Sequence, residues 1–467
     1  MRQRSEVRLP MRIVQMMCAA VMVVAMTIPA HAASLTQSWA QRYVGGTDFQ
    51  YANALAMSPD GRMAYVTGIS AGPNHEGDPY DAFATIAYDA QTGAIQWIAR
   101  YSDADTDNWA SAVVVSPDGG RLFVTGATPN GYPIVAYDAA TGVRLWTAHA
   151  EGPDYVGFHG ELAVSPDGRR VYFSGESEIG GGPETELLTV ALRASAGNTV
   201  WTSHFVDPSG QVRPSAIAVD PQGRRVFITG GTGDLNQFPT PTPPDWVTVA
   251  YRGSTGTQLW ATRYDGTGHD YDEAVAASVT PDGRRVIVAG TSTAPSGLPQ
   301  FAVVAYGAIS GEAAWMTRDG AADVRRTVAS MTMDRAGSRV FVTGSESNTD
   351  WTVNRYRTVG VSVGTGVRVW TKAFNGGTVA NAHAIAMSVG GVYVVVTGGA
   401  DTVANPYTQG YATVVYRANT GQQTASARYV SLTGWAEAEA IGVSPNGGVF
   451  VTGRGGGAYA TVAYRLT

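Results

Sequence analysis

The chain has 467 residues, among them 57 glycines and 23 prolines, and its formal net charge at pH 7 is −6. Apolar residues make up 44% of the chain, aromatic residues 10% and charged residues 15%, which excludes intrinsic disorder and indicates a turn-rich folded protein. The sequence lacks the basic excess that would indicate binding to nucleic acid or to an anionic membrane surface.

The first 32 residues predict a secretory signal peptide. Four arginines stand among the first twelve residues, and the apolar run Ile13–Ile28 is shorter than the ~20 residues of a membrane-spanning helix. Ala30-His31-Ala32 supplies a cleavage site, so we expect the mature chain to begin at Ala33; an uncleaved membrane anchor is the alternative. Either Met1 or Met11 suits as the translation start.

Signal cleavage removes the sole cysteine, Cys18. The mature chain then has no disulfide, no thiolate metal ligand and no cysteine nucleophile, so its stability must come from a large core. Loss of four arginines and one glutamate also takes the net charge from −6 to about −9. We expect an exported protein, secreted, periplasmic or on the cell surface, with no transmembrane segment in the mature chain.

A short apolar strand that ends in a small residue and glycine recurs eight times after the signal, at intervals of 49 to 60 residues. Such a period is typical of propeller blades. The strands are AYVTG (64–68), LFVTG (122–126), VYFSG (171–175), VFITG (226–230), VIVAG (286–290), VFVTG (340–344), VVVTG (394–398) and VFVTG (449–453).

Three further strands complete each repeat. An apolar strand and an SPDG-type turn precede the glycine strand, as at 58–61, 116–119 and 165–168, and such a turn joins two strands into a hairpin. A third strand follows, then a turn that ends in glycine, then a fourth strand with tryptophan four residues beyond that glycine. These tryptophans, which we expect to pack blade against blade, are Trp97, Trp146, Trp201, Trp260, Trp315 and Trp370, and Ala425 stands at the seventh position.

The eighth repeat has three strands, and its fourth is predicted at the other end of the chain. Residues 39–43 match residues 260–264 at four of five positions, which places Trp39 in the docking register. We therefore predict an all-β fold in which residues 33–467 form a single eight-bladed propeller of four-stranded antiparallel blades, closed by the N-terminal strand. Closure covers edge strands that would otherwise favour aggregation.

These patterns resemble exported bacterial propeller repeats of the SBBP and YVTN types, and the stretch AYDAATGVRLW at 136–146 is similar to the tryptophan-docking motif of the PQQ-like quinoprotein superfamily. The resemblance implies architecture, because the shared residues are turn formers and packing aromatics. Quinoprotein alcohol dehydrogenases hold their quinone beside two adjacent cysteines and a calcium ion. The mature chain has no cysteine, so we expect no PQQ cofactor.

Alternating strand direction places the SPDG-type turns on one face of the ring and the variable connections on the other, where binding residues are expected. One connection carries Asp103, Asp105 and Asp107 in a D-x-D-x-D pattern, but it lacks the glycine and glutamate of a calcium loop, which favours a solvated turn over a Ca²⁺ site. The other candidate binding residues in these connections are His159, Glu161, Asp265, His269, Asp270, Asp272, Glu273, His383, Glu437 and Glu439.

No nucleophile, metalloprotease, P-loop or dinucleotide motif stands in its required context, so the sequence assigns no catalytic residue. It favours an exported binding or scaffolding protein whose partner is a protein, a glycan or another component of the cell envelope. The alternative is an exported enzyme, such as a lyase, a hydrolase or an atypical quinoprotein, with a polar site at the channel mouth. Histidines and carboxylates that converge from several blades would favour the enzyme.

Overall fold

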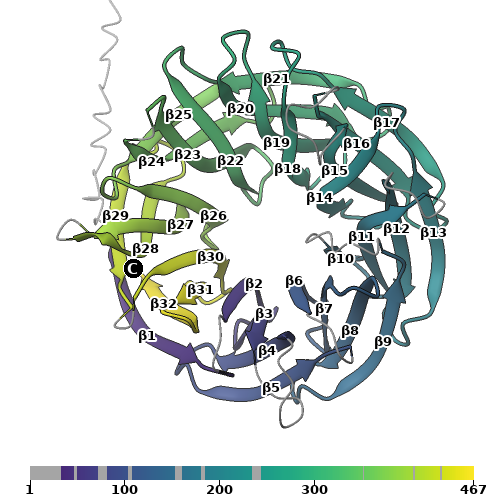
Figure 1. Cartoon of the computed structure of the whole chain (residues 1–467), viewed down its shortest axis with the longest axis horizontal. Coiled ribbons are helices and arrows are strands. Elements are labelled where there is room, and N and C mark those ends of the chain that lie inside the picture. The colour runs from purple at the N-terminus through teal and green to yellow at the C-terminus, as the bar shows by residue number, and fades with distance from the viewer. Residues whose placement is uncertain are drawn as a thin grey trace, which may run out of the picture. The chain divides into compact units, whose positions relative to one another are not determined.

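Four-stranded antiparallel sheets follow one another around a central channel (Figure 1). The computed structural model describes residues 33–46, 50–71, 81–103, 108–152, 160–179, 185–233, 243–350, 352–402, 405–431 and 434–467. Across these ranges the strands form eight sheets, and no helix is present. The predicted eight-bladed propeller is therefore confirmed. The predicted signal peptide lies outside the described residues.

The first strand of each blade lies at the channel and the second lies beside it (Figure 1). The first strands are β2 (Tyr51–Met57), β6 (Trp109–Val115), β10 (Glu161–Val164), β14 (Gln211–Val219), β18 (Asp272–Val279), β22 (Val324–Met333), β26 (Ala380–Met387) and β30 (Ala436–Val443). The second strands are β3 (Met63–Ala71), β7 (Arg121–Ala127), β11 (Arg170–Glu178), β15 (Arg225–Gly233), β19 (Arg285–Thr293), β23 (Arg339–Asn348), β27 (Tyr393–Thr402) and β31 (Gly448–Gly455).

The third and fourth strands complete each blade toward the rim. The third strands are β4 (Asp81–Asp89), β8 (Tyr132–Asp138), β12 (Thr185–Arg193), β16 (Asp245–Arg252), β20 (Pro299–Gly307), β24 (Asn354–Ser362), β28 (Asn405–Arg417) and β32 (Tyr459–Leu466). The fourth strands are β5 (Ile95–Tyr101), β9 (Arg144–Ala150), β13 (Thr199–Phe205), β17 (Gln258–Tyr264), β21 (Ala313–Asp319), β25 (Arg368–Phe374), β29 (Gln423–Tyr429) and, for the eighth blade, β1 (Leu35–Tyr43).

Strand β1 closes the ring as predicted. It pairs antiparallel with β32, with Trp39 opposite Ala463 and Tyr43 opposite Tyr459. The eighth blade therefore has the strand order β30-β31-β32-β1, in which both ends of the described chain meet in one sheet. This pairing covers the outer edge of β32, which would otherwise be open.

The two faces of the ring differ in their connections. One face, called here the turn face, carries the turns between first and second strands and between third and fourth strands. In the first of these turns the Ser58 hydroxyl donates to Asp60 at 2.6 Å and accepts the Met63 amide at 2.9 Å, while Gly61 takes a φ of +71°. The opposite face, called the loop face, carries the variable connections that lead into first and third strands.

Each docking tryptophan joins its blade to the next. The indole of Trp39 donates to the carbonyl of Ala90 at 3.1 Å and lies against Gly93, whose φ is +75°. A Cβ on that glycine would come within 2.6 Å of the ring, so both the backbone angle and the ring require glycine. The same bond and glycine recur for the six other predicted docking residues, Trp97, Trp146, Trp201, Trp260, Trp315 and Trp370.

A bulge in the first strand explains the glycine that ends the recurrent second-strand motif. In the seventh blade the register of β26 against β27 shifts between Ala382 and Ala384, and a Cβ on Gly398 would overlap the carbonyl oxygen of Asn381. Equivalent shifts occur in six of the other blades. The residues at the seven bulges are Asn53, Ser111, Ser215, Val275, Ala329, His383 and Glu439.

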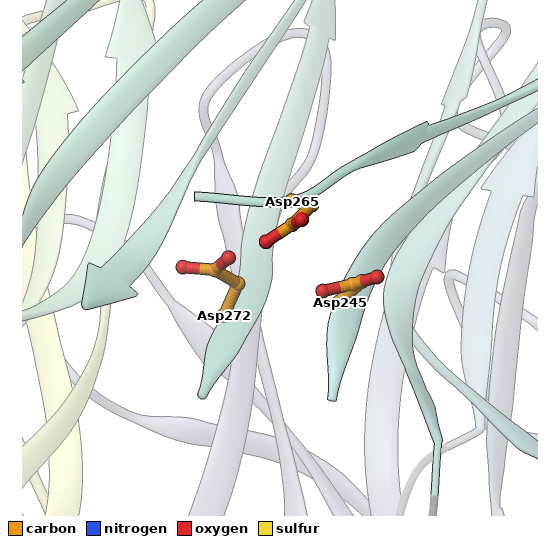
Figure 2. A group of neighbouring side chains, drawn as sticks. All are labelled: Asp245, Asp265 and Asp272. Atoms are coloured by element: carbon orange, nitrogen blue, oxygen red, sulfur yellow. The ribbon is translucent and has the colours of Figure 1, made fainter. Parts of the chain in front are cut away.

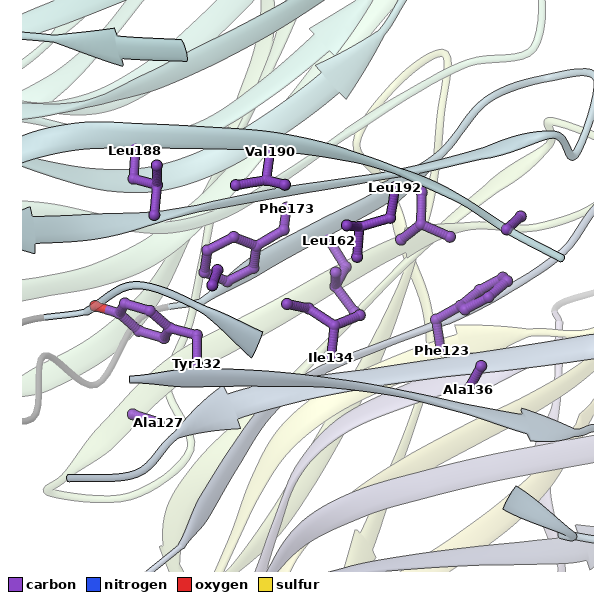
Figure 3. Close-up of a cluster of buried hydrophobic side chains, with 13 residues drawn as sticks. Phe123, Ala127, Tyr132, Ile134, Ala136, Leu162, Phe173, Leu188, Val190 and Leu192 are labelled. Carbon is purple, nitrogen blue, oxygen red and sulfur yellow. The ribbon is translucent and has the colours of Figure 1, made fainter. Parts of the chain in front are cut away.

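The core lies between neighbouring blades. Figure 3 shows one such layer, in which Phe123 and Ile134 of the second blade face Leu162, Phe173 and Leu192 of the third. All of these side chains are buried, and similar clusters fill the other junctions. The ring is therefore a rigid scaffold that fixes where each loop-face residue stands.

Candidate binding site on the loop face

The seventh and eighth blades bring three of the predicted site residues together. His383 occupies the bulge of β26 and Glu439 the bulge of β30, so both stand on strands beside the channel. The Nδ1 atom of His383 lies 3.1 Å from Glu439, and its Nε2 atom lies 3.0 Å from Glu437. The histidine thus bridges two blades through two carboxylates.

Arg454 and Trp435 extend this cluster toward solvent. The guanidinium of Arg454, from β31, lies 2.8 Å from Glu437 and 3.8 Å from Glu439. Its central carbon also lies 3.8 Å from the ring centroid of Trp435, which is cation–π distance. The indole nitrogen of Trp435 donates to the side chain of Gln409. Trp435 nevertheless keeps 40% of its surface exposed.

Charge pairing holds this cluster in one ionisation state. Burial by itself would lower the pKa of His383, but hydrogen bonds and charge from Glu437 and Glu439 outweigh burial and raise the pKa to about 9. Burial would likewise raise the pKa of Glu437, but His383 and Arg454 outweigh it and lower the pKa. At neutral pH two cations therefore balance two carboxylates.

Three aspartates form a second cluster on the loop face, between the fourth and fifth blades. Figure 2 shows Asp245 at the start of β16, Asp265 after β17 and Asp272 at the start of β18. One carboxylate oxygen of each lies within 4.8 Å of the others. Asp265 also lies 2.6 Å from Nδ1 of His269, whose φ is +47°.

Burial dominates in this second cluster. It raises the pKa of Asp245 and of Asp272, although Arg263 lies 2.6 Å from Asp245 and two backbone amides donate to Asp272. Oxygen groups of this kind suit a hard cation, but three carboxylates that bind through one oxygen each supply fewer ligands than the about six to eight that Ca²⁺ takes. Arg263 already supplies one positive charge here.

The other predicted site residues are more dispersed. Asp270 accepts from the backbone amide of Tyr271 and Glu273 from its hydroxyl, at 2.8 and 2.7 Å. Glu161 begins β10, and burial raises its pKa to about 8. The carboxylate of Asp103 contacts Tyr101, Thr128 and His149. His159, Asp105 and Asp107 lie outside the described residues.

Asp245, Arg454 and Trp435 were not among the site residues predicted from the sequence. Trp435 carried a usable signal, because it is one of four tryptophans that stand outside the docking register. Of these, Trp246 is fully buried, whereas Trp435 is exposed. Asp245 and Arg454 carried no signal of their own, since their roles depend on contacts between strands that are distant in sequence.

A third charged cluster, between the fifth and sixth blades, is buried. Arg326 lies 2.5 Å from Glu346 and 3.4 Å from Asp319, and Arg357 lies 2.8 Å from Asp319. Burial would raise the pKa of both carboxylates, but the arginines outweigh it and lower them. Because these groups bond to one another away from solvent, we assign the cluster to blade packing.

Cavities on the turn face follow the seams between blades. One of about 780 Å³ lies where the eighth blade meets the first, lined by residues such as Arg62, Asp89 and Asn446. Smaller cavities occupy the seam of the first and second blades and that of the fifth and sixth. Because residues of the repeated turns line these three cavities, we seek the functional surface on the loop face.

Comparison with known proteins supports the propeller resemblance. The model of a family described as outer membrane protein assembly factor BamB matches residues 80–248, about a third of the chain. No curated protein matches. The more specific resemblance to SBBP and YVTN repeats stays a prediction.

Solved structures are similar in fold at low identity. Quinohemoprotein alcohol dehydrogenase from Comamonas testosteroni is 13% identical, with a TM-score of 0.57 over 92% of this chain and 76% of that one. Chaetomium thermophilum Sqt1 bound to the N-terminus of ribosomal protein L10 is 12% identical, with a TM-score of 0.57 over 91% and 98%. The Dos1 propeller is 12% identical, with a TM-score of 0.58 over 92% and 95%.

These similar structures include an enzyme and a propeller bound to a protein segment, so the likeness shows the fold alone. Among the residues that the structure describes, no helix has the length and apolarity to span a membrane.

Proposed function

We propose that this chain is an exported, non-catalytic propeller that binds a component of the cell envelope through its loop face. The observation that carries the proposal is the cluster around Trp435. An exposed tryptophan held by Arg454 and Gln409 is a rigid apolar anchor surrounded by polar groups, and such anchors supply much of the energy of binding sites.

The ionisation of this cluster favours binding over acid–base catalysis. A general acid or base works best when its pKa lies near the working pH. His383, with a pKa of about 9, remains protonated at neutral pH, and Glu437, with a lowered pKa, remains charged. Neither side chain exchanges a proton readily at neutral pH, so we assign the ion pairs a structural role: they fix the positions of the side chains around Trp435.

The acidic cluster supports a second candidate, a hydrolase or lyase. Raised carboxyl pKa values at Asp245 and Asp272 beside the Asp265–His269 pair are what acid–base catalysis uses. This candidate predicts that Asp265→Asn abolishes turnover of a chromogenic ester or glycoside, whereas Trp435→Ala leaves turnover unchanged. If the wild type turns over neither esters nor glycosides, this second candidate function is contradicted.

We infer that pyrroloquinoline quinone is not a cofactor of this chain. Its three carboxylates require free cations, yet His383, Arg454 and, on the channel strand β14, Arg213 are each paired with a carboxylate. The remaining bulge positions hold small or neutral side chains such as Asn53, Ser111 and Val275. An atypical quinoprotein would instead show dye reduction by alcohols after addition of the quinone, and we expect none.

The proposed function is tested by binding to isolated bacterial envelopes. Envelopes should retain the wild-type protein, and Trp435→Ala with Arg454→Ala should lose most of that retention. Asp118→Asn, in an exposed turn on the opposite face, is the matched control and should bind like wild type. Equal retention of all three proteins would contradict a loop-face binding function.

Mass spectrometry of the exported protein should find Ala33 at its N-terminus.

A further inference from the structure

We infer that the ligand of the Trp435 cluster is a neutral saccharide, an inference that rests on the proposed binding function and names its ligand class. The cluster consists of Trp435, Arg454, Glu437, Glu439 and His383. It combines an exposed aromatic ring, charge balance, and hydrogen-bond donors beside acceptors. Each of the three features selects among ligand classes, and a neutral saccharide satisfies all of them.

The aromatic ring is built as a platform. Arg454 stands over one face of the ring, 3.8 Å from its centroid, and 40% of the residue's surface remains exposed. The bond to Gln409 and the backbone bond from Gly456 to the Trp435 carbonyl fix the residue in place. An electron-rich ring face attracts the weakly positive C–H groups on the apolar side of a sugar ring. A fixed ring also loses little entropy on binding.

Charge balance argues against an ionic ligand. Glu437 and Glu439 are matched by His383 and Arg454, with distances of 2.8 to 3.1 Å for the three closest pairs. An anionic ligand at Arg454 would displace a carboxylate or lie beside Glu437 and Glu439, and a cationic ligand would displace His383 or Arg454 or lie beside them. Breaking a hydrogen-bonded ion pair costs more than an exposed contact returns. A neutral ligand leaves the pairs intact.

Donors and acceptors remain available at the edge of the cluster. The side chain of Arg454 is 38% exposed and that of Glu439 is 24% exposed. Their charged groups lie 3.8 Å apart, so a donor and an acceptor stand side by side. Neighbouring hydroxyl groups of a sugar ring each donate and accept, which lets two adjacent hydroxyls engage both groups at once. An apolar peptide segment would leave these groups unsatisfied.

Isothermal titration of the full chain with cellohexaose, maltohexaose and hexa-N-acetylchitohexaose tests the inference. We expect saturable binding of at least one of these neutral hexasaccharides. Trp435→Ala should weaken that binding by about tenfold or more, and Trp435→Phe should retain part of the affinity. Tyr271→Ala is the matched control, because Tyr271 is another exposed aromatic residue of the loop face, and it should change affinity less than about twofold.

The outcomes separate this inference from the function on which it rests. Failure of all three hexasaccharides to bind, or binding that Trp435→Ala leaves unchanged, would overturn the saccharide inference. If envelopes still retain the protein through Trp435 but no hexasaccharide competes, the binding function stands and the ligand is of another class, such as a protein. If the loop-face variants are retained by envelopes like wild type while a hexasaccharide binds at Trp435, the envelope-binding function is contradicted and the saccharide site is supported.

Discussion

The turn face and the loop face are built from the same strands, but their residues follow different rules. On the turn face the blades follow one pattern: the first three carry the same serine–aspartate turn, and seven of the eight junctions carry a tryptophan that lies on glycine. On the loop face the seventh and eighth blades pair ions around an exposed tryptophan, whereas the fourth and fifth gather aspartates. Residues that repeat therefore serve architecture, and the departures from the repeat are where function is to be sought.

Removal of one tryptophan from each face gives the largest expected contrast. Trp39→Ala should lower the free energy of unfolding by about 3–5 kcal/mol, because it empties a buried site and loosens the strand that closes the ring. Trp435→Ala should cost less, about 1–2 kcal/mol, because that side chain is only partly buried and loses its contacts with Arg454 and Gln409. Urea unfolding of both variants measures the difference.

Trp260→Ala is the control for Trp39→Ala, because it removes the same docking bond without touching closure. Trp39→Ala should be at least as destabilised and should also aggregate, since a loosened β1 exposes the edge of β32. A Trp39→Ala protein that unfolds like wild type, with no added light scattering, would show that closure does not depend on docking.

Gly398→Ala should affect both the stability of the blade and binding at the loop face. Its new Cβ would overlap the carbonyl of Asn381, so the bulge that carries His383 must move. We expect a loss of about 1–3 kcal/mol in unfolding free energy together with weaker loop-face binding. Gly390→Ala is the control, because a Cβ there meets only an ordinary contact at 3.7 Å. Loss of stability without any effect on binding would mean that the bulge does not position the site.

The architecture could be predicted from the sequence because each of its rules lies within one repeat. The interval between glycines, the SPDG-type turns and the tryptophan register are local patterns, and Trp39 matched that register from the other end of the chain. The bulge was not foreseen, although the glycine opposite it was seen in every repeat. A conserved glycine position in a repeat indicates that another group approaches the backbone closely, but it does not identify that group.

The site could be predicted only in part, because its contacts cross between blades. His383, Glu437 and Glu439 were candidates from their loop-face positions, but the ion pairs among them depend on two bulges that face one another across a blade junction. Arg454 lies on a second strand, where the repeat suggests only packing. Asp245 joins Asp265 and Asp272 through adjacency in space, which sequence spacing does not encode.

The His383 cluster should make stability depend on pH in a defined direction. A histidine whose pKa rises from 6.5 when unfolded to about 9 when folded stabilises the fold fully below 6.5 and loses that contribution as pH rises toward 9. Relative to His383→Gln, wild type should be more stable by about 2 kcal/mol near pH 6 and nearly equal near pH 10. Urea unfolding at both pH values measures this, and a difference that grows with pH would contradict the assigned charge.

The smallest effect is expected at the one junction without a docking tryptophan. Ala425 stands in that register on β29, and its neighbour across the junction is the eighth blade, where Thr467 follows β32 instead of a turn that ends in glycine. A tryptophan there finds no glycine to lie on and no turn carbonyl to accept its N–H. Because Ala425 is half-buried at the edge of the core cluster, the new ring can turn toward solvent, and Ala425→Trp should change the free energy of unfolding by less than about 1 kcal/mol. Thermal melts measure this change and compare it with that of Trp370→Ala, which removes a complete docking contact. A clear gain in stability from Ala425→Trp would show that the tryptophan alone drives docking, and that the glycine turn is a consequence of the packing and not its cause.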